Sequence, residues 1–373
     1  MQKMILDKFS LVNFKNIADV SLTFSPKLNC FVGQNGAGKT NLLDAIYYLS
    51  FCKSAFQMQD TYNVRHGEQF FMVQGRYAEG ELPEEEISCG FHLGQRRKSF
   101  RRNGKEYARL SEHIGRIPLV LVSPRDTDMI SGPAEERRRF MNMVISQYDS
   151  TYLQELVRYQ KTLKQRNALL KMETDVDDDF LDTYDAVLTD AGQKIFSQRQ
   201  RFLEEFVPMF RQVYLSLVPE GEDVGLKYHS QVTEADFMET LQKMRTRDKI
   251  LGYTSWGVHR DDMEMTQNGY DVRREGSQGQ TKTYMIALKL AQFHFMGNKK
   301  RSIPLLLLDD IFDKLDASRV ERILQLVSQN AFGQIFITDT DRNYISEIIA
   351  RTGMDAKVFE VENGNVSEEK EQL

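Results

Sequence analysis

One eight-residue stretch, GQNGAGKT at residues 33–40, constrains the fold of this chain more than any other. It fits the pattern G-x-x-x-x-G-K-[ST] at every fixed position, and loops with this pattern wrap backbone amides around the phosphates of a nucleotide. The apolar run LNCFV before it predicts a short buried strand, and NLLDAIYYLSF after it predicts a helix. A chance glycine turn has no reason to lie in that setting. The stretch therefore predicts an α/β fold that binds a nucleoside triphosphate.

The residue types in this loop predict that the chain binds ATP and Mg²⁺. Lys39 is expected to reach the β and γ oxygens of the nucleotide, and Thr40 is expected to hold the Mg²⁺ ion. The residues expected to contact ATP are Gly33, Gln34, Asn35, Gly36, Ala37, Gly38, Lys39, Thr40 and Asn41.

A second stretch, IPLLLLDD at residues 303–310, predicts a buried parallel strand that ends in two carboxylates. Ligands of open α/β sheets bind at the carboxyl ends of the strands. Asp309 is therefore expected to hold Mg²⁺ with Thr40, and Asp310 to orient or deprotonate the attacking water. Without the phosphate loop, two solvated acids would be the better interpretation. With it, Lys39, Asp309 and Asp310 are the predicted catalytic residues.

A second glycine-rich loop, GSQGQ at residues 276–280, precedes a helical pattern and the acidic strand. The start of a helix attracts anions, yet this loop has no lysine. The order of the three motifs resembles that of the ATP-binding-cassette ATPases, in which the second loop binds the ATP held by another subunit. The resemblance implies a homodimer formed with ATP, in which Ser277, Gln278, Gly279 and Gln280 contact the partner's nucleotide. DKLD at residues 313–316 resembles the dimer-contact loop of that superfamily. The alternative is an ordinary helix start.

Three further stretches resemble a narrower family. LDKFSLVNFKNI, at residues 6–17, predicts a strand and resembles the opening of SMC-like DNA-repair ATPases, which implies that Lys15 and Asn16 touch the nucleotide. LVSPRDTDMISGPAEERRRFMN (121–142) and WGVHRDDMEM (256–265), together with SQGQ, resemble the RecF family of bacterial recombination-repair ATPases. This resemblance extends from residue 4 to about residue 360.

The resemblance implies an ABC-type, SMC-like P-loop ATPase head with an inserted helical arm domain. The head is expected to comprise residues 1–125 and 250–373, and the arm residues 126–249. Two stretches depart from the family pattern: Pro124-Arg125-Asp126 replaces the usual Pro-Glu-Asp, and Val258 replaces a proline before His259. The switch histidine of transporters is also missing after the last core strand, where QIFITDTD offers Thr338 and Asp339. The group that senses the γ-phosphate is left open.

The expected arm is an antiparallel helical hairpin between about residues 150 and 215. Leu156, Leu163 and Leu170 recur at seven-residue intervals, and a second apolar stripe runs from Leu181 to Phe202. ETDVDDD between the stripes is expected to form an acidic turn. Arms of roughly 35–45 Å follow from a rise of 1.5 Å per residue, far shorter than the coiled coils of chromosome-organising SMC proteins.

The stretch GQRRKSFRRNGKEY is the leading candidate for contact with DNA, at Arg96, Arg97, Lys98, Arg101, Arg102 and Lys105. Asn103-Gly104 predicts a two-residue hairpin turn, and Phe100 between the charges suits contact with a base or sugar. A solvated hairpin is an equally good interpretation of the charges. Further cations stand at 137–139, Lys161, Lys164 and Arg166. The cluster at 259–262 either belongs to an interface or lies close to the nucleotide, or else it is a salt-bridged turn.

Composition narrows the remaining function classes. The net charge is −5, so any DNA surface must come from local patches with charge segregated onto one face. Three scattered cysteines indicate reduced thiols and argue against a zinc site. No apolar run approaches the roughly 18–20 residues that cross a bilayer. We expect a cytoplasmic, nucleoid-associated protein with no membrane partner.

The family resemblance implies an ATP-gated DNA clamp, with gapped duplex or single-strand/duplex junctions as substrate. It also implies RecO and RecR as partners, help in loading RecA onto single-stranded DNA, a role in replication restart and the SOS response, and a weak, DNA-stimulated ATPase. Two alternatives come from other classes, the ATPase subunit of a membrane transporter and a non-catalytic chromosome scaffold. Flotation with membranes would favour the first, and a lack of ATP turnover with DNA present would favour the second.

Overall fold

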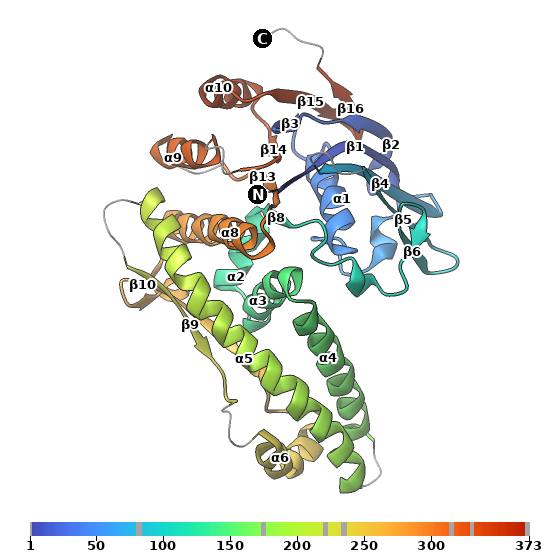
Figure 1. The fold of residues 1–373 in the computed structure, drawn as a ribbon, viewed down its shortest axis with the longest axis vertical. Helices are drawn as coiled ribbons and strands as arrows, with labels where there is room; N and C mark the ends of the chain where they lie inside the picture. The colour runs from blue at the N-terminus through green and yellow to red at the C-terminus, as the bar shows by residue number, and fades with distance from the viewer. Residues whose placement is uncertain are drawn as a thin grey trace. The chain divides into compact units, whose positions relative to one another are not determined.

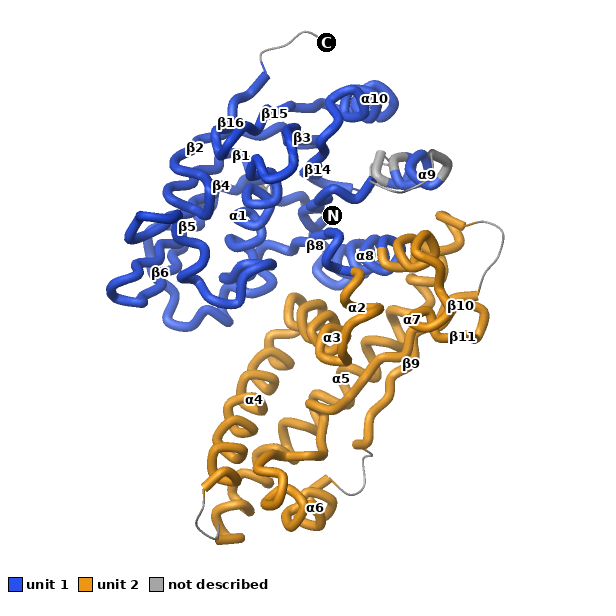
Figure 2. The backbone as a smooth tube through the Cα atoms, turned by 180° about the vertical axis from the view of Figure 1, so that it is seen from behind, with its two compact units in different colours: residues 1–126, 286–373 blue, residues 127–285 orange. Residues whose placement is uncertain are grey.

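The computed structural model describes residues 2–79, 84–172, 177–218, 223–232, 237–312, 317–328 and 332–369. The chain forms two compact units (Figures 1 and 2). The head unit consists of residues 1–126 and 286–373, and the arm unit consists of residues 127–285.

The first sheet of the head unit is mostly parallel and has the strand order β16-β15-β3-β14-β13-β8. Its strands are β3 (Leu28–Val32), β8 (Leu119–Val122), β13 (Leu305–Asp309), β14 (Ile335–Asp339), β15 (Ala356–Glu362) and β16 (Asn365–Glu368). β3, β8, β13 and β14 are buried at every position, which explains their continuous apolar sequences. The strands predicted before the phosphate loop and before the paired acids are confirmed.

The second sheet of the head unit follows the order β12-β1-β4-β5-β6-β7, and β2 also pairs with β1. Its strands are β1 (Gln2–Phe14), β2 (Ile17–Thr23), β4 (Phe70–Glu79), β5 (Glu85–His92), β6 (Arg97–Arg102), β7 (Lys105–Glu106) and β12 (Ser302–Ile303). Asn103 and Gly104 have φ values of 49° and 77°, as the predicted hairpin turn requires. The expected strand at the start of the chain is likewise confirmed.

Helix α1 (Lys39–Phe51) packs against strands of both sheets, and almost all of its residues are buried. The head unit also contains α9 (Ala317–Ser328), α10 (Arg342–Thr352) and the second half of α8 (Gln278–Lys300). Short 3₁₀ helices lie at Asp60–Asn63, Leu110–Glu112 and Pro124–Thr127. Because α1 begins inside the phosphate loop and is held on two sides, the loop rests on a rigid base.

The arm unit is built around an antiparallel helical hairpin, as predicted (Figure 1). Its helices are α2 (Asp128–Ser131), α3 (Ala134–Tyr148), α4 (Ser150–Leu170), α5 (Asp178–Leu217), α6 (Phe237–Leu251) and α7 (Val272–Glu275). The 40 residues of α5 extend about 60 Å at 1.5 Å per residue, longer than expected. The buried stripe continues through Phe206, Phe210 and Tyr214, so the helix continues with it. The expected acidic turn falls partly outside the described residues.

The return from arm to head differs from the expected position at residue 250. Residues 250–285 remain in the arm unit, because β10 (Asp262–Gln267) pairs antiparallel with β9 (Val224–His229) along its whole length. β11 (Tyr270–Asp271) completes this three-stranded sheet. Arg199 on α5 also donates to the Asp261 carboxylate at 2.6 Å. Strand pairing between distant segments decides this boundary, and no composition shift in the sequence marks it.

Candidate nucleotide site and nucleic-acid surfaces

The phosphate loop joins β3 to α1, and its glycines are required by close contacts. A Cβ on Gly33 would overlap the Val361 carbonyl of the neighbouring strand β15. Gly38 has a φ of 122°, and a Cβ there would lie 2.9 Å from the Asn16 amide. Side chains at either position would push the loop out of shape, so these glycines keep its backbone amides available for phosphate oxygens.

Lys39 is folded over the loop in this structure. Its Nζ donates to the Gly33 carbonyl at 2.6 Å and to the Gln34 carbonyl at 2.9 Å. Burial lowers the pKa of Lys39, while the neighbouring carboxylates of Asp310, Asp309 and Asp339 act to raise it. The ammonium is thus held by neutral carbonyls that phosphate oxygens can replace.

Thr40 and Asp309 meet at the carboxyl end of β13, as predicted. The Thr40 hydroxyl donates to the Asp309 carboxylate, with oxygen distances of 2.9 and 3.1 Å. Thr338 on β14 donates to the same carboxylate at 2.8 Å. Burial raises the pKa of Asp309, and the hydrogen bonds from Thr338 and Thr40 oppose that effect.

This donor set fits Mg²⁺, which prefers hard oxygen ligands and keeps several of its waters. Among the described residues, no group of three or more His, Cys, Asp or Glu side chains could hold a metal ion. The protein ligands would therefore be the Thr40 hydroxyl and the Asp309 carboxylate, with phosphate oxygens and waters completing the shell. Thr338 was not predicted as an orienting donor for this carboxylate, although the TDTD stretch did mark it as polar.

Asp310 follows the end of β13 with a φ of 49°, an uncommon conformation for a non-glycine residue. Its backbone N–H donates to the Thr338 hydroxyl at 3.0 Å, which fixes the chain at this turn. Asp310 therefore leaves the strand direction that Asp309 still follows. Asp339, at the end of β14, accepts from the Asp341 N–H at 2.8 Å, and burial raises its pKa.

Lys15 and Asn16 support the loop from the β1–β2 turn. The Asn16 amide donates to the Ala37 carbonyl at 3.0 Å and accepts from the Asn41 amide at 2.8 Å. Lys15 is paired with the fully buried Asp44 of α1 at 2.5 Å. Asp44 also accepts from Ser54 and from the Ala55 N–H, so it connects α1 to the segment that follows. Sequence reasoning missed Asp44, because an acid inside an apolar helix gives no signal of its role.

A cavity of about 520 Å³ opens beside Thr40 and Asp309, and we refer to it as the nucleotide cavity. It is lined by Lys15, Thr40, Asn41, Phe56, Gln57, Tyr62, Pro124, Arg125 and Asp309. Phe56, Tyr62 and Arg125 were not predicted as part of the site. Arg125 had one sequence signal, its departure from the family pattern, whereas the two aromatic residues had none.

The second glycine loop forms a reciprocal cap at the start of α8. The Ser277 N–H donates to the Gln280 side-chain carbonyl at 3.0 Å, and the Gln280 N–H donates to the Ser277 hydroxyl at 3.2 Å. This is a capping box, which explains the Ser-x-x-Gln spacing without any ligand. Ser277 and Gln278 are exposed. The predicted dimer-contact loop at 313–316 lies outside the described residues.

The basic hairpin formed by β6 and β7 differs in part from the expected DNA surface. Arg96, Arg101 and Lys105 are exposed, and no carboxylate of a described residue pairs with them. Two other cations pair with acids on neighbouring strands, Arg97 with Glu106 at 3.5 Å and Arg102 with Glu85.

Two residues of this hairpin point into the head unit and correct our prediction. The Lys98 side chain is only 18% exposed, and its Nζ binds Asp60 at 2.8 Å and the Cys52 carbonyl at 2.8 Å. Phe100 is buried against His113 and is not available to a base. Alternation along β6 places every second side chain inside, and a charge run hides that alternation.

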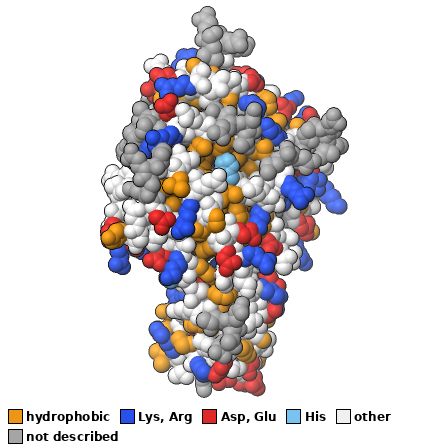
Figure 3. All heavy atoms as spheres, turned by 60° about the vertical axis from the view of Figure 1, so that its left-hand side comes forward, with side chains coloured by type: hydrophobic (Ala, Val, Ile, Leu, Met, Phe, Trp, Pro, Cys, Tyr) orange, Lys and Arg blue, Asp and Glu red, His pale blue; other side chains and the backbone are white. Residues whose placement is uncertain are grey.

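Two arginines of the arm unit are not available for the expected positive face, whereas Arg139, Lys161 and Lys164 are exposed. Arg137 is buried and donates to Asp262, and Arg166 is fully buried between Asp185 and Asp248. On the face shown in Figure 3, charges of both signs are intermingled. His259 shares a hydrogen bond with the Tyr159 hydroxyl through its Nδ1, at 2.9 Å. Its Nε2 lies 2.9 Å from the Thr254 carbonyl oxygen. The cluster at 259–262 is thus a paired turn of the arm unit.

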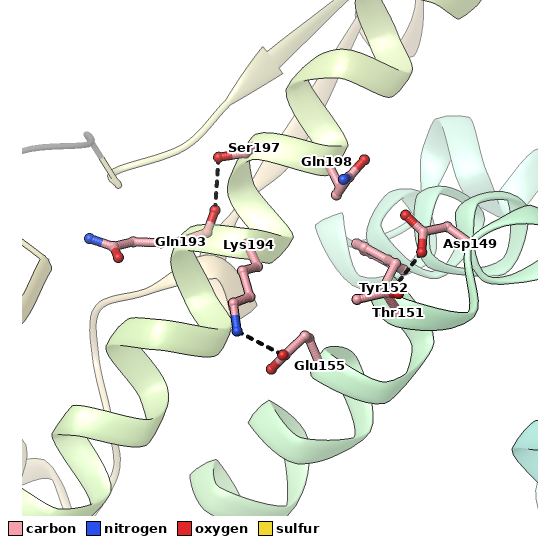
Figure 4. Close-up of a pocket in the computed structure, with 8 residues that line it drawn as sticks. All are labelled: Asp149, Thr151, Tyr152, Glu155, Gln193, Lys194, Ser197 and Gln198. Carbon is pink, nitrogen blue, oxygen red and sulfur yellow. Dashed lines mark hydrogen bonds and ion pairs between the residues drawn. The ribbon is translucent and has the colours of Figure 1, made fainter.

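A second cavity, of about 290 Å³, lies between α4 and α5 (Figure 4). It is lined by Asp149, Thr151, Tyr152, Glu155, Gln193, Lys194, Ser197 and Gln198. The Lys194 ammonium binds the Glu155 carboxylate at 2.9 Å, so these two charges of the cavity neutralise each other.

No helix in the described part of the chain is both long and apolar enough to cross a membrane.

Comparison with known proteins gives a consistent result. The family model of the RecF/RecN/SMC N terminal domain matches residues 5–366. The chain is 51% identical to the DNA replication and repair protein RecF of Bacteroides fragilis, over 99% of both chains. It is 52% identical to the RecF protein of Parabacteroides distasonis, over 97% of this chain and 99% of that one.

Solved structures agree with these relatives. The recombination mediator protein RecF with ATP, in the RecFOR pathway, superimposes with a TM-score of 0.87 at 29% identity, covering 99% of this chain and 100% of that one. An Smc head domain from Pyrococcus furiosus has a TM-score of 0.58 at 17% identity, covering 98% and 96% of the two chains, and shows the shared fold alone. The predicted ABC-type ATPase head with an inserted helical arm is confirmed.

Proposed function

Because this chain belongs to the RecF family of DNA replication and repair proteins, we propose that it is an ATP-dependent DNA-binding protein of recombinational repair. The observation that carries the proposal is the convergence of Lys39, Thr40 and Asp309 at the carboxyl edge of the parallel sheet. In a family of ATPases, that convergence supports hydrolysis of ATP by this chain.

Each residue of the site has a role in this proposal. The loop amides from Gly33 to Thr40 and the Lys39 ammonium bind the phosphates, and Thr40 with Asp309 holds Mg²⁺. Asp310 orients the attacking water or accepts its proton. Mg²⁺ held by these residues would stabilise negative charge on the phosphate oxygens as a Lewis acid. Lys15, Asn16 and Asn41 keep the loop in position. The proposed turnover is weak and is stimulated by DNA.

We further propose that ATP closes two copies of the chain into a dimer. The exposed start of α8, with Ser277, Gln278, Gly279 and Gln280, would contact the nucleotide held by the partner. Binding energy at such an interface lasts only as long as the γ-phosphate, so hydrolysis reopens the dimer. Gapped duplex DNA or a single-strand/duplex junction is the proposed substrate of the closed dimer.

The cellular part of the proposal rests on the relatives. Solved RecF proteins are described as recombination mediators of the RecFOR pathway. For this chain we propose the corresponding partners RecO and RecR, help in loading RecA, support of replication restart and the SOS response, and a cytoplasmic, nucleoid-associated location. The segregated positive face that the charge runs suggested is not part of this proposal, since several of those arginines are buried.

The test is the solution mass of the protein with and without ATP and Mg²⁺, measured by light scattering. Asp310→Asn slows hydrolysis and should double in mass when ATP is added. Asp310→Asn combined with Ser277→Arg should bind ATP but remain a monomer, because the arginine blocks the exposed helix start.

Lys39→Ala is the matched control for nucleotide binding, and it should neither bind ATP nor change in mass. If Asp310→Asn binds ATP and stays monomeric even with gapped duplex present, the dimer proposal is wrong. If it dimerises equally with and without Ser277→Arg, the dimer forms through another surface.

A further inference from the structure

Lys15 and Arg125 both line the nucleotide cavity, but they differ in whether a carboxylate neutralises their charge. Lys15 is neutralised by the buried carboxylate of Asp44 at 2.5 Å. The Arg125 side chain is exposed to the cavity, and no carboxylate of the described residues pairs with it. A positive charge without a counterion in a phosphate-binding cavity requires an explanation.

Arg125 is held by weak, neutral contacts to one residue. Its guanidinium lies 5.1 Å from the centroid of the Phe56 ring, and its Nη1 donates to the Phe56 carbonyl at 3.0 Å. Both contacts are weaker than a charge-assisted pair with a phosphate, which an arginine fork can bind through two parallel hydrogen bonds. A phosphate within reach would therefore displace the ring and the carbonyl.

The backbone beneath Arg125 is firmly anchored, in contrast to its side chain. The Asp126 N–H donates to the Ser123 carbonyl at 3.0 Å, and the Ser123 N–H donates to the Asp126 carboxylate at 2.7 Å. The same carboxylate pairs with the buried Lys289 at 3.1 Å. This closed turn directs the acid at 126 away from the cavity and fixes the point from which the arginine reaches into it.

Other residues that line the cavity indicate which phosphate of ATP Arg125 can bind. Thr40 and Asp309, the proposed Mg²⁺ ligands, line the same cavity as Arg125. Mg²⁺ held by these two residues would neutralise charge on the phosphates of ATP. Because Arg125 lines the same cavity as Thr40 and Asp309, a phosphate bound beside those two residues would lie in the cavity that the arginine faces.

We propose that Arg125 binds the γ-phosphate of ATP and makes the site select triphosphate over diphosphate. Phe56 is its resting contact when that phosphate is absent. This inference rests on the proposed function, since it requires the cavity to bind ATP. It supplies a γ-phosphate contact in a chain that lacks the switch histidine of transporters, and it places that contact in the same subunit as the phosphate loop.

The test compares the affinities for ADP and for a non-hydrolysable ATP analogue, each with Mg²⁺, by isothermal titration calorimetry. Arg125→Gln should weaken binding of the analogue by about ten- to a hundredfold, the range for removal of a charge-assisted hydrogen bond, and leave ADP binding unchanged. Arg125→Lys should recover part of the affinity, since it restores the charge without the fork. Phe56→Leu should not weaken the analogue, because the ring competes with the phosphate for the arginine.

Arg65→Gln serves as the matched control, because Arg65 is a partly exposed arginine of the same unit that does not line the cavity. It should change neither affinity. The inference is overturned if Arg125→Gln leaves the analogue unaffected, or if it weakens ADP and the analogue by the same factor. If the wild-type protein binds neither nucleotide, the proposed function itself fails, whereas equal binding by wild type and Arg125→Gln removes this inference alone.

Discussion

Hydrogen bonds orient the carboxylate of Asp309, the proposed Mg²⁺ ligand. Asp309 accepts hydrogen bonds from Thr40 and Thr338, which come from different elements of the head unit. Groups that are oriented in advance need no reorganisation during reaction, which is the main source of electrostatic catalysis. Lys39 and Arg125 differ from this acid, because their present partners are neutral groups that phosphates can replace.

A buried histidine, His113, is expected to make the free energy of unfolding depend on pH. His113 is fully buried between the Tyr107 hydroxyl and the Leu49 carbonyl, and burial lowers its pKa to about 4. The folded state therefore binds fewer protons than the unfolded state, whose histidine titrates near 6.5. The contribution of neutral, buried His113 to the free energy of unfolding is complete above about pH 6.5. It is lost as the pH falls toward 4, and the whole loss is roughly 3 kcal/mol.

The free energy of unfolding, measured in urea at several pH values, checks this sign. His113→Gln should be less stable than the wild type at pH 7 but should lose less stability between pH 6.5 and 4.5. His259, whose burial also lowers its pKa to about 4, acts in the same direction and remains in both proteins. Identical slopes for the two proteins would contradict the assignment.

At the scale of elements, buried ion pairs hold the helices of the arm unit together. Arg166 of α4 donates to Asp185 of α5 at 2.7 Å and to Asp248 of α6 at 2.8 Å. Arg245 of α6 also donates to Asp185, at 3.0 and 2.7 Å. Because these groups are fully or nearly buried, each charge depends on its partners.

Asp185→Asn should therefore destabilise the arm unit strongly. The substitution removes one negative charge from the buried network and leaves Arg166 with Asp248 alone and Arg245 with the half-exposed Asp182. The expected cost is about 3 kcal/mol, the lower end of the range for a broken buried pair. Thermal or urea unfolding measures the decrease in stability. The matched control is Asp190→Asn on the same helix, where the exposed acid binds Lys194 and Arg158 and its removal should change stability little. Equal effects of the two substitutions would refute a special role for the buried network.

At the scale of the whole molecule, DNA binding should depend on exposed cations of the β6–β7 hairpin with which no carboxylate of a described residue pairs. Arg96→Gln with Arg101→Gln should weaken binding to gapped duplex and lower the salt slope by about 0.9 for each phosphate that is no longer neutralised. Fluorescence anisotropy across a range of NaCl concentrations, with an ATP analogue present, gives both quantities. Lys98→Gln is the contrasting variant, since it breaks the ion pair with Asp60 and should reduce stability rather than the slope. An unchanged slope in the double variant would place the DNA surface elsewhere.

Elements with a local sequence pattern were predicted correctly, whereas features that depend on contacts between distant segments were not. The strand, loop and helix around residues 28–51 follow from local apolar patterns, and so do the acidic strand and the hairpin turn at Asn103-Gly104. The boundary between the units does not, because it depends on pairing between β9 and β10, which are far apart in sequence. Helix α5 ends at Leu217, close to the predicted end of the hairpin near residue 215, but its 40 residues make it longer than the roughly 35–45 Å expected for an arm.

The sequence by itself determined the motifs of fixed spacing: the phosphate loop, the acid at the strand end and the glycine-rich start of α8. These are local patterns in which the residue type sets the backbone geometry or supplies the reacting group. Only the tertiary structure decided which charges are available. Arg166, Lys98 and Arg125 look alike in a list of cations, yet one is buried between acids, one binds Asp60, and one faces the nucleotide cavity. The surroundings of a charge come from residues far away in the chain, so its local sequence does not specify them.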